Sequence, residues 1–215
     1  MSVIEGTGGV VYATFRVTLS AASGKIATVN YATSNSTALA GEDYFSRAGK
    51  LTFLPGTTAQ NLSVQIRTDA KFEPDEQFFF DLSNPSNATI ARSRATATIL
   101  NDDPQPKISI NDVSVLEGNS GTTPAVFTVS LSNPSYQDIT VQYATADGTA
   151  TAPSDYMATS GTLIIPAGST SRTITVLVNS DTTPELNETF TVNLSSPTNA
   201  TISVATGHGT ILNDD

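Results

Sequence analysis

The sequence predicts an all-β chain made of two consecutive copies of one sandwich domain. Short alternating segments rich in Val, Ile, Thr and Phe are bounded by Gly, Pro, Asn and Asp, and helical periodicity is almost absent. The second half of the 215 residues repeats the first at a constant offset of 112, so that residues 115–118 (VLEG) correspond to residues 3–6 (VIEG). A hydrophobic content of 38% is enough to form a core in each copy of about 100 residues.

The second copy shows the expected strands in full. Val126, Thr128 and Ser130 alternate with Phe127 and its apolar neighbours, as in a strand with one buried face. We expect strands at 107–110, 113–116, 124–131, 139–145, 161–165, 171–178, 189–195 and 204–212. About seven strands with turns at this spacing are typical of an immunoglobulin-like antiparallel sandwich, although the Cys–Trp–Cys pattern of true immunoglobulin domains is missing.

The repeat sets the expected domain boundaries. Residues 1–103 form the first copy, Pro104–Pro106 a short linker, and residues 107–215 the second copy. Because the two prolines restrict the backbone, we expect limited bending at the linker. The first copy has no counterpart of Lys107–Ile110, so it is predicted to lack its first strand, with a sheet edge that is exposed or filled by upstream sequence.

Composition argues against several functional classes. A formal charge of −10 with scattered bases disfavours binding to nucleic acid. The chain has no Cys and one His, which leaves little room for thiolate chemistry or a transition-metal site. We find no apolar run long enough to insert into a membrane and no visible signal peptide. No nucleophile–base pair recurs in the two copies, so we do not expect an enzyme.

The acidic residues follow the repeat, whereas the basic residues do not. Fourteen of the 20 acids pair at the 112-residue offset, and none of the ten Lys and Arg does. Ordinary solvation of loop tips explains a single Asp-Asp pair, but it does not explain why only acids are shared. The paired acids are Glu5, Asp43, Asp69, Glu73, Glu76, Asp102 and Asp103, with Glu117, Asp155, Asp181, Glu185, Glu188, Asp214 and Asp215.

Strand parity places these acids at one end of each sandwich. Successive antiparallel strands reverse direction, and the paired acids fall in connections that all lie on the same side. Like charges about 5 Å apart repel by roughly 3 kcal/mol at an effective dielectric near 20. A hard divalent cation would relieve this repulsion. Calcium fits carboxylates from several loops better than magnesium, which keeps its waters, or zinc, which prefers His and Cys.

At these residues the chain resembles the Calx-beta domain family. The motifs are the V-x-E-G opening, residues 143–150 (YATADGTA), 154–156 (SDY) and 161–163 (GTL), the acidic loop 181–188, and the Asn-Asp-Asp ending. The resemblance covers nearly the whole chain twice. It implies a seven-stranded sandwich that binds calcium through the loops at one end, with the fourteen paired acids as ligands.

The sequence departs from the family pattern at a few of these positions. Thr68 and Ser180 stand where the strongest calcium binders of the family have Asp, and Asn101 and Asn213 replace the first Asp of the terminal triplet. Lys71 lies inside the acidic loop of the first copy, where the second has Thr183, and is expected to weaken the first site.

The functional expectation is a calcium-rigidified adhesion or spacer module of a larger surface or secreted protein, located outside the cell or at its surface. Its expected partners are calcium ions, adjacent domains of the same chain, and a protein or glycan. Two alternatives remain open: a regulatory calcium sensor coupled to a partner domain, and a calcium-independent adhesin.

Overall fold

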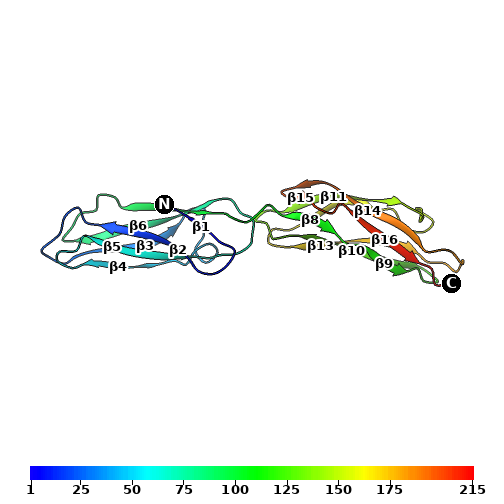
Figure 1. Cartoon of the computed structure of the whole chain (residues 1–215), viewed down its shortest axis with the longest axis horizontal. Helices are drawn as coiled ribbons and strands as arrows, with labels where there is room; N and C mark the ends of the chain where they lie inside the picture. The colour runs from blue at the N-terminus through cyan, green and yellow to red at the C-terminus, as the bar shows by residue number, and fades with distance from the viewer. The chain divides into compact units, whose positions relative to one another are not determined.

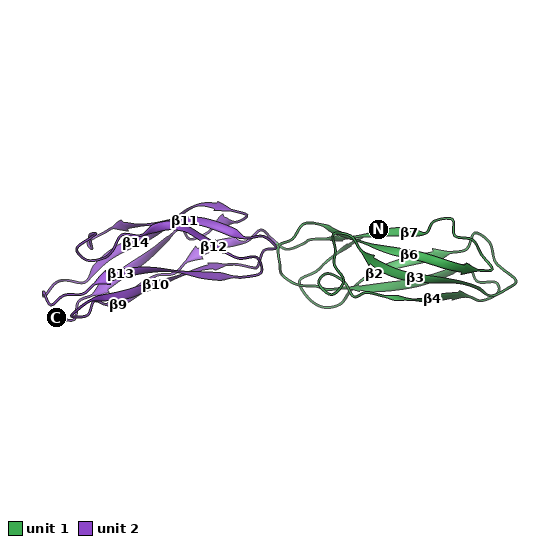
Figure 2. Ribbon diagram, turned by 180° about the vertical axis from the view of Figure 1, so that it is seen from behind, with its two compact units in different colours: residues 1–103 green, residues 104–215 purple.

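A computed structural model describes all of residues 1–215, which form two compact units, residues 1–103 and 104–215 (Figure 2). The chain consists of strands and connecting loops (Figure 1), which confirms the all-β sandwich prediction. No helix in the structure is long and apolar enough to cross a membrane.

Unit 1 is a sandwich of a five-stranded sheet, in the order β1-β7-β6-β3-β4, and a two-stranded sheet, β2-β5. Its strands are β1 (Ser2–Ile4), β2 (Val11–Thr18), β3 (Ala27–Asn35), β4 (Ala48–Phe53), β5 (Ala59–Ile66), β6 (Glu76–Ser86) and β7 (Arg94–Leu100).

Unit 2 repeats this arrangement with a fuller second sheet. The sheets have the orders β12-β11-β14-β16-β9 and β13-β10-β8-β15. The strands are β8 (Lys107–Ile110), β9 (Val113–Leu116), β10 (Thr122–Leu131), β11 (Ile139–Asp147), β12 (Ser160–Ile165), β13 (Ser171–Asn179), β14 (Glu188–Thr198), β15 (Thr201–Ile202) and β16 (Thr206–Leu212).

Several strand ends of unit 2 lie one or two residues from their predicted positions, and two larger differences stand out. β14 continues through residues 196–198, beyond the expected end of the strand at residue 195, because an irregularity in its pairing with β11 lets the strand run on past Pro197. The two-residue strand β15 was not predicted, because a segment that short shows no periodicity. It lies beside β8, and unit 1 has no strand that corresponds to β8 or β15.

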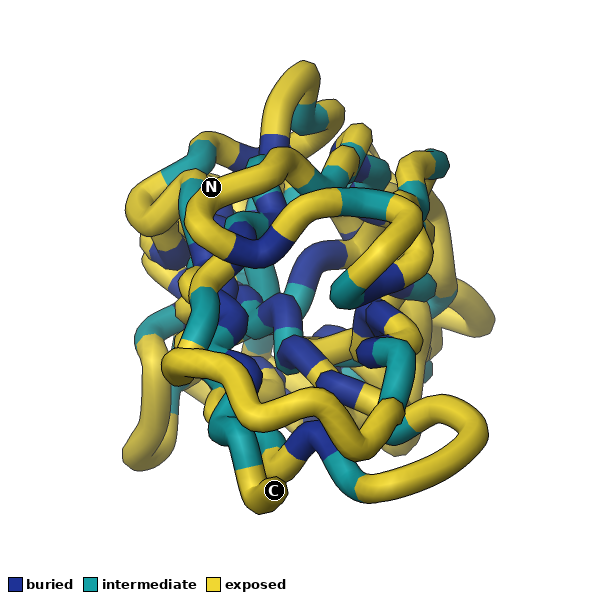
Figure 3. Tube along the Cα trace, turned by 90° about the vertical axis from the view of Figure 1, so that its right-hand side faces the viewer, coloured by how far each residue is buried: buried dark blue, intermediate teal, exposed yellow.

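Aromatic rings fill the core of each unit. Buried positions lie on the inner part of the chain trace and exposed positions follow the outer loops (Figure 3). Tyr44 stacks on Phe78 in unit 1 with ring centroids 4.3 Å apart. Tyr156 stacks on Phe190 in unit 2 at 4.6 Å, and Phe127 packs edge-on against the same phenylalanine. Such pairs add stabilisation beyond the area that they bury. The repeated Asp-Tyr motif therefore supplies a core residue to each unit.

The hydroxyl of each of these tyrosines anchors a long connection to the end of a strand. Tyr44 donates to Asn35 Oδ1, and Tyr156 donates to Asp147 Oδ1, both at 2.6 Å. Either side chain serves, because Asn and Asp offer the same acceptor oxygen. Asp147 is the last residue of β11 and accepts this anchoring hydrogen bond. The anchor fixes the backbone next to Asp43 and Asp155.

Removing the two hydroxyls should destabilise the units unequally. Tyr156→Phe is expected to lower the free energy of unfolding of unit 2 by about 1.5–3 kcal/mol, because its acceptor is charged, and Tyr44→Phe that of unit 1 by about 0.5–1.5 kcal/mol. Denaturant titration, followed by amide hydrogen exchange in each unit, measures both. Tyr136→Phe, at a side chain that is 41% exposed, is the control. Equal losses in all three variants would contradict the anchor.

Candidate metal centres

Each unit gathers its seven repeated acids at one end, just beyond strand ends. β1 and β7 run parallel with Ile4 opposite Leu100, so the residues after them emerge together, and the Glu5 amide donates to the Leu100 carbonyl at 2.9 Å. β6 is antiparallel to β7 and begins at this same end with Glu76. The loops from β3 to β4 and from β5 to β6 bring Asp43, Asp69 and Glu73 to it.

A glycine allows the tight turn after the first buried acid. Gly6 and Gly118 have φ angles of +82° and +83°, a region that residues with a side chain seldom adopt. Their amides donate to Asp102 Oδ1 and Asp214 Oδ1 at 2.9 Å. The Glu-Gly motif at the start of each unit is thereby tied to the Asp-Asp motif at its end.

Three carboxylates form the centre of the cluster in unit 1. Oxygens of Asp43, Glu73 and Glu76 all lie within 4.8 Å of one another. Glu5, whose residue is only 4% exposed, lies beside them. Burial, reinforced by the charges of Asp69 and the other nearby acids, raises the pKa of Glu5 to about 8. Full ionisation of this cluster is therefore unfavourable without a compensating cation.

The pKa of Glu76 is raised as well, and here a hydrogen bond with a neighbouring acid adds to the effect of burial. Burial is the largest cause that raises its pKa to about 8, followed by a hydrogen bond with Asp43 and the negative charges of Asp43 and Glu73. Burial also raises the pKa of Asp103, with the charge of Asp102 adding to it. With a pKa of about 8, Glu5 and Glu76 thus hold protons at neutral pH that ordinary surface acids would release.

Lys71 lies within this cluster and is the only basic side chain that forms an ion pair there. Its ammonium contacts Glu73, and its own backbone amide donates to Asp69 Oδ1 at 2.7 Å. Burial works to lower the pKa of Lys71, but the contact with Glu73 and the charges of Asp69 and Asp43 raise it overall. Unit 1 therefore neutralises part of its own negative charge.

Unit 2 builds the same centre without a lysine. Oxygens of Asp155, Glu185 and Glu188 lie within 4.8 Å of one another. Burial, together with the charges of Asp181 and Glu185, raises the pKa of Glu117, and burial with the charge of Asp155 raises that of Glu188. Burial also acts on Asp155, but hydrogen bonds from Thr151 and Ser154 bring the pKa of that carboxyl below its usual value.

The acids around each centre differ in how free their oxygens are. Asp181 accepts from the Thr183 amide at 2.6 Å and Asp214 from Gly118, so each has one oxygen engaged by the backbone. Asp215 is exposed and accepts from the Asn119 side chain. All fourteen predicted acids thus lie at the loop ends of their units, with three in each centre and the others around them.

Each centre also has a neighbouring acceptor side chain that the sequence did not reveal, Asp75 in unit 1 and its counterpart Asn187 in unit 2. Asp75 Oδ1 accepts from the Asn101 amide at 3.0 Å, and its counterpart Asn187 accepts from the Asn213 amide at 3.1 Å. A search for shared acids misses this pair, because one member is an amide. A search for shared acceptor side chains at the 112-residue offset would have found it.

The terminal Asn-Asp-Asp run of each unit also holds an oxygen that lacks a donor. Asp103 Oδ2 in unit 1 and Asn213 Oδ1 in unit 2 are buried and have no hydrogen-bond partner. Asn101 and Asn213 instead use their amide nitrogens, which donate to the carbonyls of Asp103 and Asp215. A buried oxygen without a donor is costly unless a cation or water meets it. The donor set, all oxygen, suits a hard divalent cation.

Comparison with known proteins identifies the family. A family model described as the Calx-beta domain matches residues 1–103 and again residues 105–215. The sodium/calcium exchanger Calx of Drosophila melanogaster is 30% identical over 173 residues, which is 80% of this chain and 18% of the exchanger. The adhesion G-protein coupled receptor V1 of Danio rerio is 31% identical over 171 residues, covering 74% of this chain and 3% of the receptor.

Similarity extends to a matrix protein and to a solved structure. The extracellular matrix organizing protein FRAS1 of Mus musculus is 33% identical over 129 residues, covering 54% of this chain and 3% of that protein. A crystal structure of the calcium binding domain CBD12 of CALX1.1 covers 97% of this chain and 95% of its own at 23% identity and a TM-score of 0.46. The chain spans less than a fifth of the length of each of the three curated relatives. On the two matches of the family model, the chain belongs to the Calx-beta domain family and contains two consecutive copies of that domain.

Proposed function

We propose that each unit binds calcium at its acid cluster and that the bound ions rigidify the tandem, which acts as a non-catalytic adhesion or spacer module. The observation that carries the proposal is the convergence of three carboxylates within 4.8 Å in both units, surrounded by further acids. At such separations two like charges repel by about 3 kcal/mol at an effective dielectric near 20. A divalent cation converts that repulsion into attraction.

The residues present fit calcium. The site in unit 1 would be formed by Glu5, Asp43, Asp69, Glu73, Glu76, Asp102 and Asp103, and that in unit 2 by Glu117, Asp155, Asp181, Glu185, Glu188, Asp214 and Asp215. Calcium accepts six to eight oxygens in flexible geometry, as several loops would supply. The buried Oδ2 of Asp103 and Oδ1 of Asn213 have no hydrogen-bond donor, which supports the presence of a cation near each terminal run.

The proposed mechanical role rests on where the ligands lie along the chain. Asp102 and Asp103 directly precede Pro104, so an ion that they hold would also hold the start of the linker. When bound, calcium supplies the charge that lets these loops close on one another. Without calcium, repulsion among the carboxylates would loosen the loops and leave the linker free to bend.

The proposed setting is a larger protein at the cell surface or outside the cell, with adjacent domains of the same chain and a protein or glycan as partners. The names of two relatives, an adhesion receptor and an extracellular matrix organizing protein, support this setting. Affinity separates the module from a regulatory sensor. Roughly 0.1–1 mM dissociation constants suit an extracellular module, whereas roughly micromolar values would favour a sensor.

A pair of reciprocal substitutions tests the sites. We expect Lys71→Thr to tighten calcium binding in unit 1 about tenfold and Thr183→Lys to weaken it in unit 2 about tenfold, since one unit charge is removed or added inside a carboxylate cluster. Calorimetric titration of the full chain resolves the two sites. Lys50→Thr, which converts an exposed lysine to its counterpart Thr162, is the control. If Lys71→Thr behaves like the control, Lys71 does not compete with calcium.

The raised pKa values predict how stability depends on pH in chelator. Glu5 and Glu76 bind protons up to about pH 8 in the folded unit but only to about pH 4.5 when unfolded, so folding binds protons between these values. The melting temperature of unit 1 should therefore fall as the pH rises from 5 to 8. Calcium should reduce this fall, because it binds the deprotonated ligands.

The double substitution Glu5→Gln with Glu76→Gln should flatten the pH profile in chelator, whereas Glu42→Gln at an exposed neighbour should not. Thermal melts that follow unit 1 by hydrogen exchange measure the effect. A melting temperature that rises between pH 5 and pH 8 in chelator would show that the acids are not crowded in solution.

Small-angle scattering tests the mechanical role. With calcium, the full chain should show a narrower distribution of maximum dimensions than in chelator, because the linker is held at its start. The variant Glu73→Gln with Glu76→Gln should give the profile of the chelated chain under both conditions. Superimposable profiles of the unmodified chain with and without calcium would refute rigidification, even if calorimetry finds both sites.

A further inference from the structure

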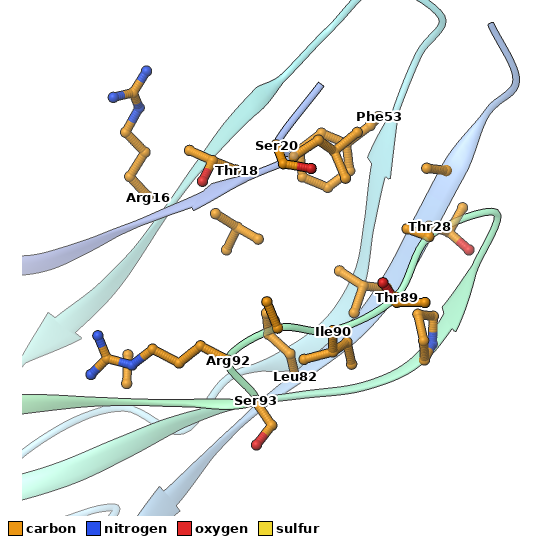
Figure 4. Close-up of a pocket in the computed structure, with 18 of the residues that line it drawn as sticks. Arg16, Thr18, Ser20, Thr28, Phe53, Leu82, Thr89, Ile90, Arg92 and Ser93 are labelled. Atoms are coloured by element: carbon orange, nitrogen blue, oxygen red, sulfur yellow. The ribbon is translucent and has the colours of Figure 1, made fainter. Parts of the chain in front are cut away.

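A groove of about 630 Å³ opens along unit 1, separate from the acid cluster. One wall is the end of β2, including Arg16 and Thr18, and the other is the segment around Thr89 and Arg92 between β6 and β7 (Figure 4). Apolar side chains such as Phe53 form its inner surface. β2 pairs on one side with β5 and has no strand on its other side.

Unit 2 shows what these walls accept. There β8 lies between β10 and β15, with Ile110 opposite Val129 and Ile108 opposite Leu131. Both isoleucines are buried, at 5% and 0% exposure. At the 112-residue offset, Val129 and Leu131 correspond to Val17 and Leu19, and both of these line the groove. The groove in unit 1 is therefore shaped like the site that holds β8.

The apolar residues that line the groove in unit 1 are more exposed than the corresponding residues of unit 2. Val129 and Leu131 are buried in unit 2, at 0% and 8% exposure, whereas Val17 and Leu19 are only partly buried in unit 1. Covering apolar surface of this kind is favourable by about 25 cal/mol per Å². The walls of the groove thus have apolar surface available for an additional strand.

Backbone donors of the walls point to a strand as well. In unit 2, the Ser203 amide donates to the Ile108 carbonyl at 2.8 Å, and the Ser132 amide to the Lys107 carbonyl at 3.0 Å. The corresponding amides in unit 1, of Ala91 and Ser20, make no hydrogen bond within the protein. Backbone groups at a sheet edge are a ready template for strand addition.

Charge distinguishes this groove from its counterpart. Arg16 and Arg92 come from opposite walls and lie at the same end of the groove in Figure 4. Neither guanidinium makes an ion pair, whereas the nearby Arg94 is paired with Asp81. In unit 2 the corresponding residues are the neutral Thr128 and Val204. Arg92 donates to the Arg94 carbonyl at 2.9 Å, but neither its charge nor that of Arg16 is paired with a carboxylate. Two such arginines beside an apolar groove favour a carboxylate in the segment that fills it.

We propose that this groove is an acceptor for an extended strand supplied on the amino-terminal side of Met1, with the pattern apolar–acidic–apolar. Met1 corresponds to Val113, so a link of two residues, like that between Ile110 and Val113, suffices to connect the strand to β1. The apolar residues take the places of Ile108 and Ile110.

The register places the acidic residue. In unit 2 the outward-facing Ser109 lies opposite Ser130, which corresponds to Thr18. Arg16 is two residues from Thr18 on the same exposed face of β2. Diagonal neighbours on one face of a sheet lie about 7–8 Å apart, within reach of an arginine side chain. A carboxylate between the two apolar residues would therefore meet Arg16.

Extended versions of the full chain test the proposal. Three hexapeptides are joined ahead of Met1: Lys-Ile-Ser-Ile-Asn-Asp, which copies residues 107–112, the acidic form Lys-Ile-Asp-Ile-Asn-Asp, and Lys-Ser-Asp-Ser-Asn-Asp without the apolar pair. The first two should raise the melting temperature of unit 1 by about 4–8 °C and slow hydrogen exchange of the Ser20 and Ala91 amides at least about tenfold. The third should do neither. The proposal would be overturned if all three extensions had the same effect, or if no extension had any effect.

The arginines and the source of the strand are tested separately. The acidic form should stabilise more than the serine form, and Arg16→Gln with Arg92→Gln should abolish that difference while leaving the gain from the isoleucines. An unchanged difference would remove the arginines from the proposal. The acidic hexapeptide added in trans to the unextended chain should bind weakly. Binding in trans that protects the Ser20 and Ala91 amides as fully as the extension would show instead that a separate chain is the occupant.

Discussion

Crowded negative charge at one end of each sandwich is the constraint on which the rest of the structure depends. Three carboxylates lie within 4.8 Å of one another in each unit, and a nearly buried glutamate, Glu5 or Glu117, lies next to them. An antiparallel sandwich brings alternate connections to the same end, so acids that are far apart in the sequence meet there. Burial then makes their ionisation unfavourable, as the raised pKa of Glu5 and Glu117 shows.

Several features of the fold hold these acids in place. The parallel pairing of the first and last strands of the larger sheet joins the Glu-Gly and Asp-Asp motifs. The stacked tyrosines fix the connection that carries Asp43 and Asp155, because their rings are in the core and their hydroxyls bind the end of the preceding strand. The apolar core therefore helps to position the acidic residues at its end.

The two units differ in whether a basic side chain lies among their repeated acids. Unit 1 places Lys71 among its acids, whereas unit 2 has Thr183 there and leaves the charge uncompensated by any base. Eight of the ten basic residues of the chain lie in unit 1, among them the unpaired arginines beside its groove. The same fold thus carries one acid cluster that a lysine partly neutralises and one that no basic side chain neutralises. The groove and the acid cluster of unit 1 share no residues, so the proposed strand addition and the proposed ion binding would use separate parts of that unit.

The sequence by itself determined the strand content, the duplication and the end of the sandwich at which the acids gather. It could do so because alternation of apolar residues reports one buried face, and because two copies of one domain expose what both retain. Only the tertiary structure decided which three acids converge, that Lys71 pairs with Glu73, and that Asn35 and Asp147 are equivalent anchors. These depend on loop conformations and on distances between segments remote in sequence, which local periodicity does not encode. The groove likewise emerged only when the walls of unit 1 could be compared with those that enclose β8, since the packing around a strand is set by its neighbours in space.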